Sequence, residues 1–109
     1  LWPVRVLDCK GSGYNSGVIK GINWCAKKAT SGGKWVANMS LGSGIDPALN
    51  KAVADARKLG VVMVVAAGND SADACNQSPA SEPLAITVAA STSSDQRAWF
   101  SNYGSCVDI

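Results

Sequence analysis

Hydrophobic side chains recur near the start of the chain at intervals of three and four residues. Val18 and Ile22 belong to this series, whereas three lysines occupy the opposite positions. That spacing places the apolar residues on one face of an α-helix. With Asn15 or Ser16 as its N-terminal cap, the pattern predicts an amphipathic helix that ends before the glycine-rich residues 30–33.

A second helix is predicted to begin at Asp46 and Pro47 and to end at Gly60. Aspartate caps free amide groups, proline is tolerated at the first helical position, and glycine is common at the C-terminal end. Its buried stripe is predicted to consist of Leu49, Ala52, Val53 and Ala56.

Four apolar runs predict strands, at residues 4–8, 35–41, 61–67 and 85–90. The third run is apolar without alternation, which is typical of a parallel strand covered on both faces. Because strands and helices alternate, the sequence predicts an α/β fold, a doubly wound parallel sheet with helices on both faces. A less regular β region is expected to follow.

Composition and charge limit the range of partners. The 109 residues are 47% hydrophobic, which suits one compact unit, and ten basic and eight acidic side chains leave a net charge of +2. The basic residues are scattered, so nucleic acid is not expected as a partner. The longest apolar stretch, residues 60–68, is far shorter than the roughly 20 residues of a membrane helix, so no membrane contact is expected.

The chain opens without methionine or a signal-peptide pattern, and we expect it to come from the middle of a longer protein. None of the four cysteines shows the C-x-x-C spacing of zinc or redox sites. Cys75 and Cys106 lie in polar, loop-like surroundings, which favours disulfides and an oxidising, extracellular setting. Cys9 and Cys25 leave three alternatives open: a mutual bond, free thiols, or partners outside the chain.

Three glycine-rich loops follow predicted strands, at residues 11–13, 42–44 and 68–69. In doubly wound sheets, ligands bind beyond the carboxyl ends of the strands, so we expect the three loops to line one edge.

Nucleotide binding is one hypothesis for that edge, because the first loop begins like a G-x-G-x-x-G turn. However, Ser16 occupies the third glycine position, and no acidic residue between Asp8 and Asp46 is present to hold a ribose hydroxyl. The sequence therefore disfavours a nucleotide.

Backbone recognition of an extended peptide is the second hypothesis, since glycine allows another main chain to approach closely. Asn69 follows a buried strand and offers an amide donor to a developing oxyanion. By residue type alone, Gly68, Asn69 and Asp70 are more typical of a simple turn.

Five sequence blocks, in this order along the chain, favour peptide recognition over a simple turn: residues 4–8 with 11–13, and residues 38–42, 66–69, 78–80 and 100–104. Through these blocks the chain resembles the subtilisin-like serine proteases, of the extracellular proteinase K type. The resemblance implies that peptide substrate pairs with main chain on two sides of a cleft, at Gly11, Ser12 and Gly13 and at Ser40, Leu41 and Gly42. It also implies a roomy pocket for a large apolar side chain, lined by Ala66, Ala67 and Gly68. Asn69 matches the oxyanion-hole asparagine of the family.

The resemblance further implies a structural calcium ion near Pro83, Ala85 and Asp108, and a disulfide between Cys75 and Cys106. In such relatives the cysteine that matches Cys9 pairs with one upstream, and Cys25 has no assigned partner.

The catalytic Asp, His and Ser of the family match no residue of this chain, which contains no histidine. We therefore predict that residues 1–109 are the central part of a single subtilisin-like peptidase domain, incomplete as an α/β fold. This segment would bind substrate and form the oxyanion hole of a secreted serine endopeptidase, with the remaining portions of the domain as partners. Alone, the chain is predicted to be inactive. A non-catalytic peptide-binding module with the same groove is the alternative.

Overall fold

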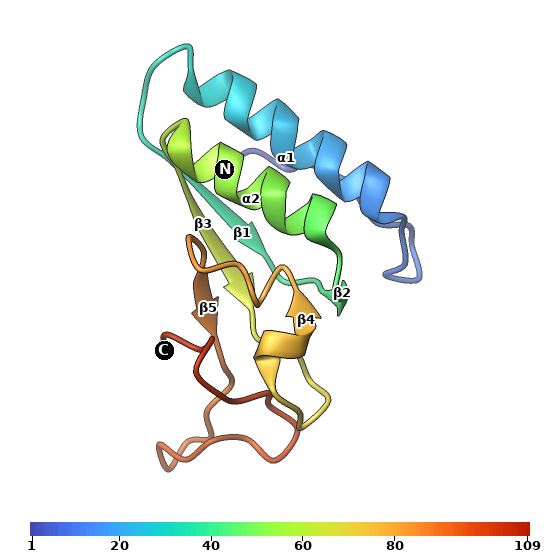
Figure 1. Cartoon of the computed structure of the whole chain (residues 1–109), viewed down its shortest axis with the longest axis vertical. Helices are drawn as coiled ribbons and strands as arrows, with labels where there is room; N and C mark the ends of the chain where they lie inside the picture. Colours follow the sequence, from blue (N-terminus) through green and yellow to red (C-terminus); the bar gives the residue numbers. More distant parts are fainter.

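A three-stranded parallel sheet forms the centre of the structure, a computed structural model that describes residues 1–109 (Figure 1). Its strands lie in the order β1 (Trp35–Met39), β3 (Val61–Ala66) and β5 (Ile86–Val88). In the register, Met39 lies opposite Val65, and Val64 lies opposite Ile86. Two helices, α1 (Asn15–Ala29) and α2 (Pro47–Lys58), accompany the sheet. The α/β class and the parallel sheet are confirmed.

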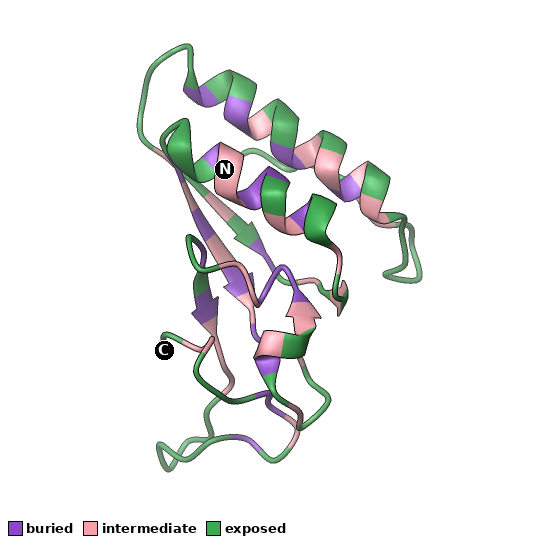
Figure 2. Ribbon diagram, viewed as in Figure 1, coloured by how far each residue is buried: buried purple, intermediate pink, exposed green.

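Both helices lie side by side on the same face of the sheet (Figure 1). The main core lies between them and alternate residues of the strands, among them Met63 and Val65, which are fully buried (Figure 2). From α1 and α2 it receives Val18, Ile22, Ala26, Ala29, Leu49, Ala52, Val53 and Ala56. The predicted stripes of both helices are therefore the buried ones.

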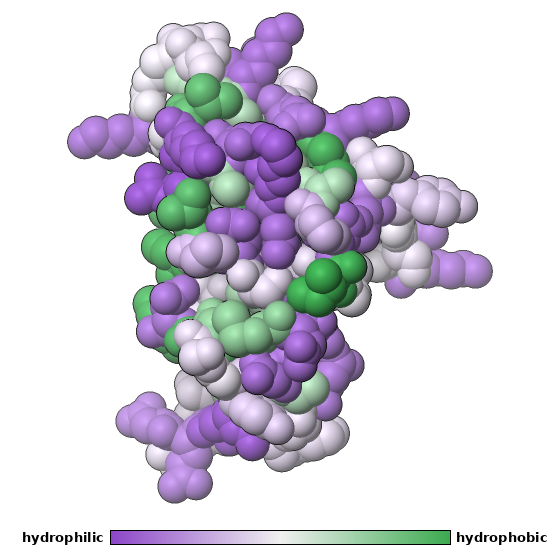
Figure 3. Space-filling view, in the orientation of Figure 1, coloured by the Kyte–Doolittle hydropathy of each residue, from purple (hydrophilic) through white to green (hydrophobic).

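The second face of the sheet carries no helix within residues 1–109. Val36 is 68% exposed, Ile86 is 37% exposed, and Val62 and Val64 are half-buried. The sequence had predicted helices on both faces and residues 61–67 covered on both sides. In this chain, of the two α-helices only α2 lies in a crossover between strands of the sheet, from β1 to β3, and α1, which precedes β1, packs beside α2 on the same face. Green, apolar surface is visible along the edge of the molecule at the height of the strands (Figure 3).

Residues 4–8 form no strand, in contrast to the prediction. They pair with no neighbouring strand, and a strand exists only through its hydrogen-bonded ladder. Val4 and Val6 instead pack against α1, where a Cβ on Gly21 would lie only 3.2 and 2.6 Å from them. The β-branched residues that favour a strand are present, but the ladder that would make one is missing.

The helix ends differ in how well the sequence predicted them. Asp46 caps α2 by accepting hydrogen bonds from the amides of Ala48 (2.9 Å) and Leu49 (3.1 Å), with Pro47 next, as predicted. Gly60 follows the last turn with a φ of +98°, which glycine adopts easily. The cap position of α1 is occupied by Tyr14, which makes no side-chain cap hydrogen bond, and not by Asn15 or Ser16 as predicted.

The region after β3 contains elements too short to be read from a periodic pattern. A 3-10 turn, Ala74–Asn76, leads into β4 (Gln77–Ser78), which pairs antiparallel with β2 (Ser43–Gly44). The predicted strand 85–90 shortens to β5, and residues 91–109 form only isolated bridges, in agreement with a less regular region.

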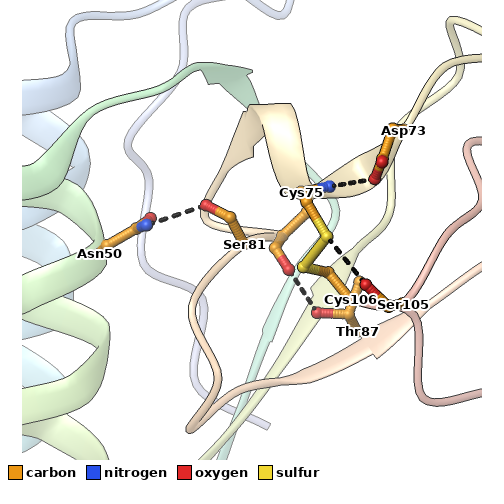
Figure 4. Close-up of a disulfide and its surroundings, with 8 residues drawn as sticks. Asn50, Asp73, Cys75, Ser81, Thr87, Ser105 and Cys106 are labelled. Carbon is orange, nitrogen blue, oxygen red and sulfur yellow. Dashed lines mark hydrogen bonds between the residues drawn. A yellow bond between two sulfur atoms is a disulfide. The ribbon is translucent and has the colours of Figure 1, made fainter.

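A disulfide joins Cys75 to Cys106 with a Cα–Cα distance of 5.3 Å, as the resemblance implied (Figure 4). It ties the 3-10 turn to the C-terminal residues, beside Thr87 of β5, whose hydroxyl donates to the carbonyl of Ala80 at 2.9 Å. Cys9 and Cys25 are free thiols, the first exposed and the second half-buried. Neither helix combines the length and hydrophobicity needed to cross a membrane.

Candidate functional site

A cavity of about 250 Å³ lies where the carboxyl ends of β1 and β3 meet. Parallel strands end at the same edge of a sheet, so the loops that follow them are brought together there. The cavity is lined by Ser40, Leu41, Gly42, Ala66, Gly68, Asn69, Asp70 and Gln77. Most of the predicted residues from the second and third glycine-rich loops thus share one cavity.

Asn69 stands at the exposed rim of this cavity. Its carboxamide takes part in no hydrogen bond within the chain, although the main chain on both sides of it is hydrogen-bonded. Both of its N–H groups are therefore available to an oxygen atom placed in the cavity.

The turn that carries Asn69 is built on a glycine that no other residue could replace without strain. Gly68 has a φ of +104°, and a Cβ at this position would collide with Nδ2 of Asn102 and lie 3.0 Å from Oε1 of Gln77. The simple turn and the available amide donor therefore do not exclude each other, because the tight turn is what places Asn69 at the rim.

Asn102 supports this turn from beneath, with none of its surface exposed. Its Oδ1 accepts hydrogen bonds from the amides of Asp70 (2.9 Å) and Ala72 (3.0 Å), and its Nδ2 donates to the carbonyl of Ala67 (2.9 Å). The role of Asn102 was not predicted from the sequence. A buried asparagine 33 positions after Asn69 gives no local signal of such a contact.

Two polar side chains make the cavity less apolar than the sequence predicted. Nε2 of Gln77 donates to Oδ2 of Asp70 at 2.6 Å, and both side chains line the cavity. Ala67 does not line it, because it is buried against Ala74 and Ala80. The sequence analysis missed Gln77, since β4 brings it to the cavity only through its pairing with β2.

The first glycine-rich loop lies in a different hollow, of about 740 Å³. Ser12 and Gly13 line this hollow together with Asp8, whereas Gly11 lines neither. Of the three loops expected to line one edge, the second contributes Gly42 and the third contributes Gly68 and Asn69 to the same cavity, whereas the first lies apart. Without a strand at residues 4–8, the first loop is not fixed to the sheet edge.

Asn15 connects the start of α1 to the loop before α2. Its Nδ2 donates to Oδ2 of Asp46 at 2.7 Å and to Oγ of Ser43 at 3.2 Å. Together with the cap bonds, this contact lowers the pKa of Asp46. The hydrogen bonds that the amides of Ser12 and Lys10 donate to Asp8 lower the pKa of that carboxyl in the same way.

Comparison with known proteins agrees with this geometry. The sequence profile of the subtilase family, peptidase family S8, matches residues 1–109, which is the whole chain. The chain belongs to the subtilase family.

Curated relatives of this subtilase chain carry protease names. It is 56% identical over 109 residues to an extracellular serine proteinase of Thermus sp. (strain Rt41A), covering all of this chain and 26% of that relative. It is 56% identical over 108 residues to subtilisin-like protease 7 of Arthroderma benhamiae, covering 97% of this chain and 27% of that relative. The chain thus spans about a quarter of the length of these relatives.

Among solved structures, the subtilase chain is similar to a cold adapted subtilisin-like serine proteinase. The TM-score is 0.91 at 56% sequence identity, and the match covers 94% of this chain and 37% of the other. The fold of this segment is therefore that of a subtilisin-like proteinase.

The residues expected near calcium in this subtilase chain offer oxygen atoms of the kind that calcium prefers. Asp108 is exposed, and one of its carboxylate oxygens accepts a hydrogen bond from the amide of Thr87 at 2.8 Å. Among the loop hydrogen bonds, none ends on the carbonyl oxygen of Pro83 or Ala85. No group of three acidic, histidine or cysteine side chains gathers anywhere in the chain.

Proposed function

We propose that this chain is the substrate-binding and oxyanion-hole segment of an extracellular serine endopeptidase of the subtilase family. The observation that carries the proposal is the free carboxamide of Asn69 at the rim of the cavity shared by residues 40–42, 66 and 68. The protease names of relatives that are 56% identical support it.

In the proposed reaction, the main chain of Ser40, Leu41 and Gly42 binds an extended peptide. Gly11, Ser12 and Gly13, which lie apart from this cavity in the 109-residue chain, are proposed to bind its other side in the complete domain. A serine supplied by the remaining portions of the domain adds its Oγ to the scissile carbonyl carbon, and a histidine takes the hydroxyl proton. The carbonyl oxygen becomes negatively charged and accepts a hydrogen bond from Asn69. Collapse of this intermediate expels the amine, which takes the proton from the histidine, and water then hydrolyses the acyl-enzyme.

The test is the substitution Asn69→Ala in the complete peptidase domain that contains this segment. Loss of one oxyanion donor is expected to lower kcat by about 10²–10³-fold with little change in KM; this range was established on a subtilisin and is carried over to this chain. Asn76→Ala is the matched control, because Asn76 is exposed and does not line the cavity.

An Asn69→Ala domain with undiminished kcat would contradict the oxyanion role. A complete protein that binds peptide without hydrolysing it would instead indicate the non-catalytic binding module.

The isolated chain of 109 residues is proposed to have no peptidase activity, because it contains no histidine to act as the base. Purified chain incubated with a chromogenic peptide should release no product above the uncatalysed rate. Release that disappears on Asn69→Ala would contradict this.

We also propose that Pro83, Ala85 and Asp108 contribute to a structural calcium site in the complete domain. The free carbonyl oxygens of the loop and the exposed carboxylate support it. The Cys75–Cys106 disulfide supports an extracellular location, since disulfides persist in oxidising compartments.

A further inference from the structure

We propose that Asn102 is a positioning residue for Asn69, holding the turn at residues 67–72 so that the Asn69 carboxamide faces the cavity. This inference rests on the proposed function, because it assigns to Asn102 an effect on the oxyanion donor.

The hydrogen bonds on both sides of Asn69 support this positioning role. On the N-terminal side, the Asn102 side chain donates to the carbonyl of Ala67, and its main-chain amide donates to the carbonyl of Gly68 (3.0 Å). On the C-terminal side, its Oδ1 accepts from the amides of Asp70 and Ala72. One residue therefore holds the main chain immediately before and after Asn69, while the Asn69 side chain stays free.

The donor and acceptor atoms of the Asn102 side chain also suit this role. The site needs one donor and an oxygen that accepts two hydrogen bonds, on a side chain short enough for a fully enclosed position. Asparagine meets all of these requirements, whereas aspartate lacks the donor and an apolar residue lacks both. An apolar residue would leave the amides of Asp70 and Ala72 and the buried carbonyl of Ala67 without these partners, which is unfavourable for the folded turn.

The orientation of Asn69 matters for how well it can stabilise an oxyanion. A donor stabilises a developing charge best when it is already oriented, because no reorganisation is then needed during the reaction. Asn69 has no hydrogen bond of its own to orient it, so its direction depends on the main chain that Asn102 holds. A shift of about 1 Å in a reacting group costs up to about 100-fold in rate.

The experiment is a double-mutant cycle in the complete peptidase domain, with Asn102→Ala, Asn69→Ala and both together, assayed on a peptide substrate. Asn102→Ala is expected to lower kcat by about 10- to 100-fold with KM changed by less than about threefold. In the Asn69→Ala background, the same substitution should lower kcat by no more than about twofold, since the group it positions is gone. Equal losses in both backgrounds would overturn the proposal.

A second variant and a direct structural measurement support the cycle. Asn102→Asp keeps the volume and the accepting oxygen but loses the donor to Ala67, and it takes the place of Asn102→Ala in the cycle if that variant does not fold. Amide hydrogen exchange should accelerate at Asp70 and Ala72 in Asn102→Ala, and unchanged exchange there would overturn the proposal. Asn50→Ala is the control, because it removes the carboxamide that donates to Ser81 outside the cavity and should leave kcat unchanged.

The two proposals fail in distinguishable ways. If the unmodified domain hydrolyses no peptide, the proposed function fails, and the exchange rates alone decide whether Asn102 holds the turn. If the unmodified domain is active and depends on Asn69, but the cycle is additive, only the positioning role fails.

Discussion

The side chain of Asn102 fills the space that a Cβ on residue 68 would need, and the left-handed backbone of Gly68 excludes other residues for a second reason. The turn and its support are thus fitted to each other across 34 positions of sequence. This pair determines where Asn69, the residue between the two hydrogen-bonded halves of the turn, is held.

Gly68→Ala is expected to destabilise the complete domain by about 1–3 kcal/mol, because the new Cβ meets Asn102 and the φ of +104° becomes strained. The free energy of unfolding, measured by denaturant titration, checks the expectation. Gly44→Ala is the control, because its Cβ would meet no atom within 4 Å and its φ is not left-handed. Equal stability of the two variants would show that the turn relaxes without cost.

Removal of the disulfide tests how the 3-10 turn is tied to the C-terminal residues. The bond closes a loop with a sequence separation of 31, so the double substitution Cys75→Ser and Cys106→Ser should destabilise the complete domain by about 2–4 kcal/mol. Thermal and denaturant unfolding measure the loss. A neutral double substitution would indicate that the surrounding hydrogen bonds suffice.

The lowered pKa of Asp46 predicts that the fold loses part of its stability in acid. Hydrogen bonds from Asn15 and from the amides of Leu49 and Ala48 lower its pKa in the folded state, so its ionised form stabilises the fold. This stabilisation is fully present above the ordinary value of 3.8 and is lost as the pH falls through the lower folded value.

Asp46→Asn removes the titration and keeps a side chain that can cap a helix. The variant should therefore lose less thermal stability than the unmodified domain when the pH is lowered from about 5 to about 2. Asp8 and Asp55, whose pKa values are also lowered, remain as shared contributors in both proteins. Identical pH profiles would exclude Asp46 as a contributor.

Calcium removal tests the proposed metal site. Chelation should lower the unfolding midpoint of the complete domain, and added calcium should restore it, because an ion bound only by the folded state stabilises that state. Asp108→Asn should reduce this calcium-dependent shift, whereas Asp95→Asn, at another exposed aspartate, should not. A midpoint that is indifferent to calcium in the unmodified domain would contradict the site.

Local pattern was sufficient for the two helices, for the central strand and for the fold class. The spacing of Val18 and Ile22, the cap at Asp46 and the apolar run at β3 each depend on residues close in sequence, so they are visible in the sequence itself. The strand ends also predicted glycine-rich loops at one edge, but the roles of Asn69 and of residues 40–42 came from the resemblance to the family, since residue type alone favoured a simple turn at Asn69.

The packing of the helices on one face and the positions of Gln77 and Asn102 depend on contacts between residues distant in sequence. The face on which both helices pack depends on contacts of α1 with α2 and of α2 with β3, which no single segment encodes. Gln77 reaches the cavity only through the pairing of β4 with β2, and Asn102 reaches the turn of Asn69 only when the C-terminal loop folds beneath it. The residues of these contacts are distant in sequence, and only the packed chain brings them together.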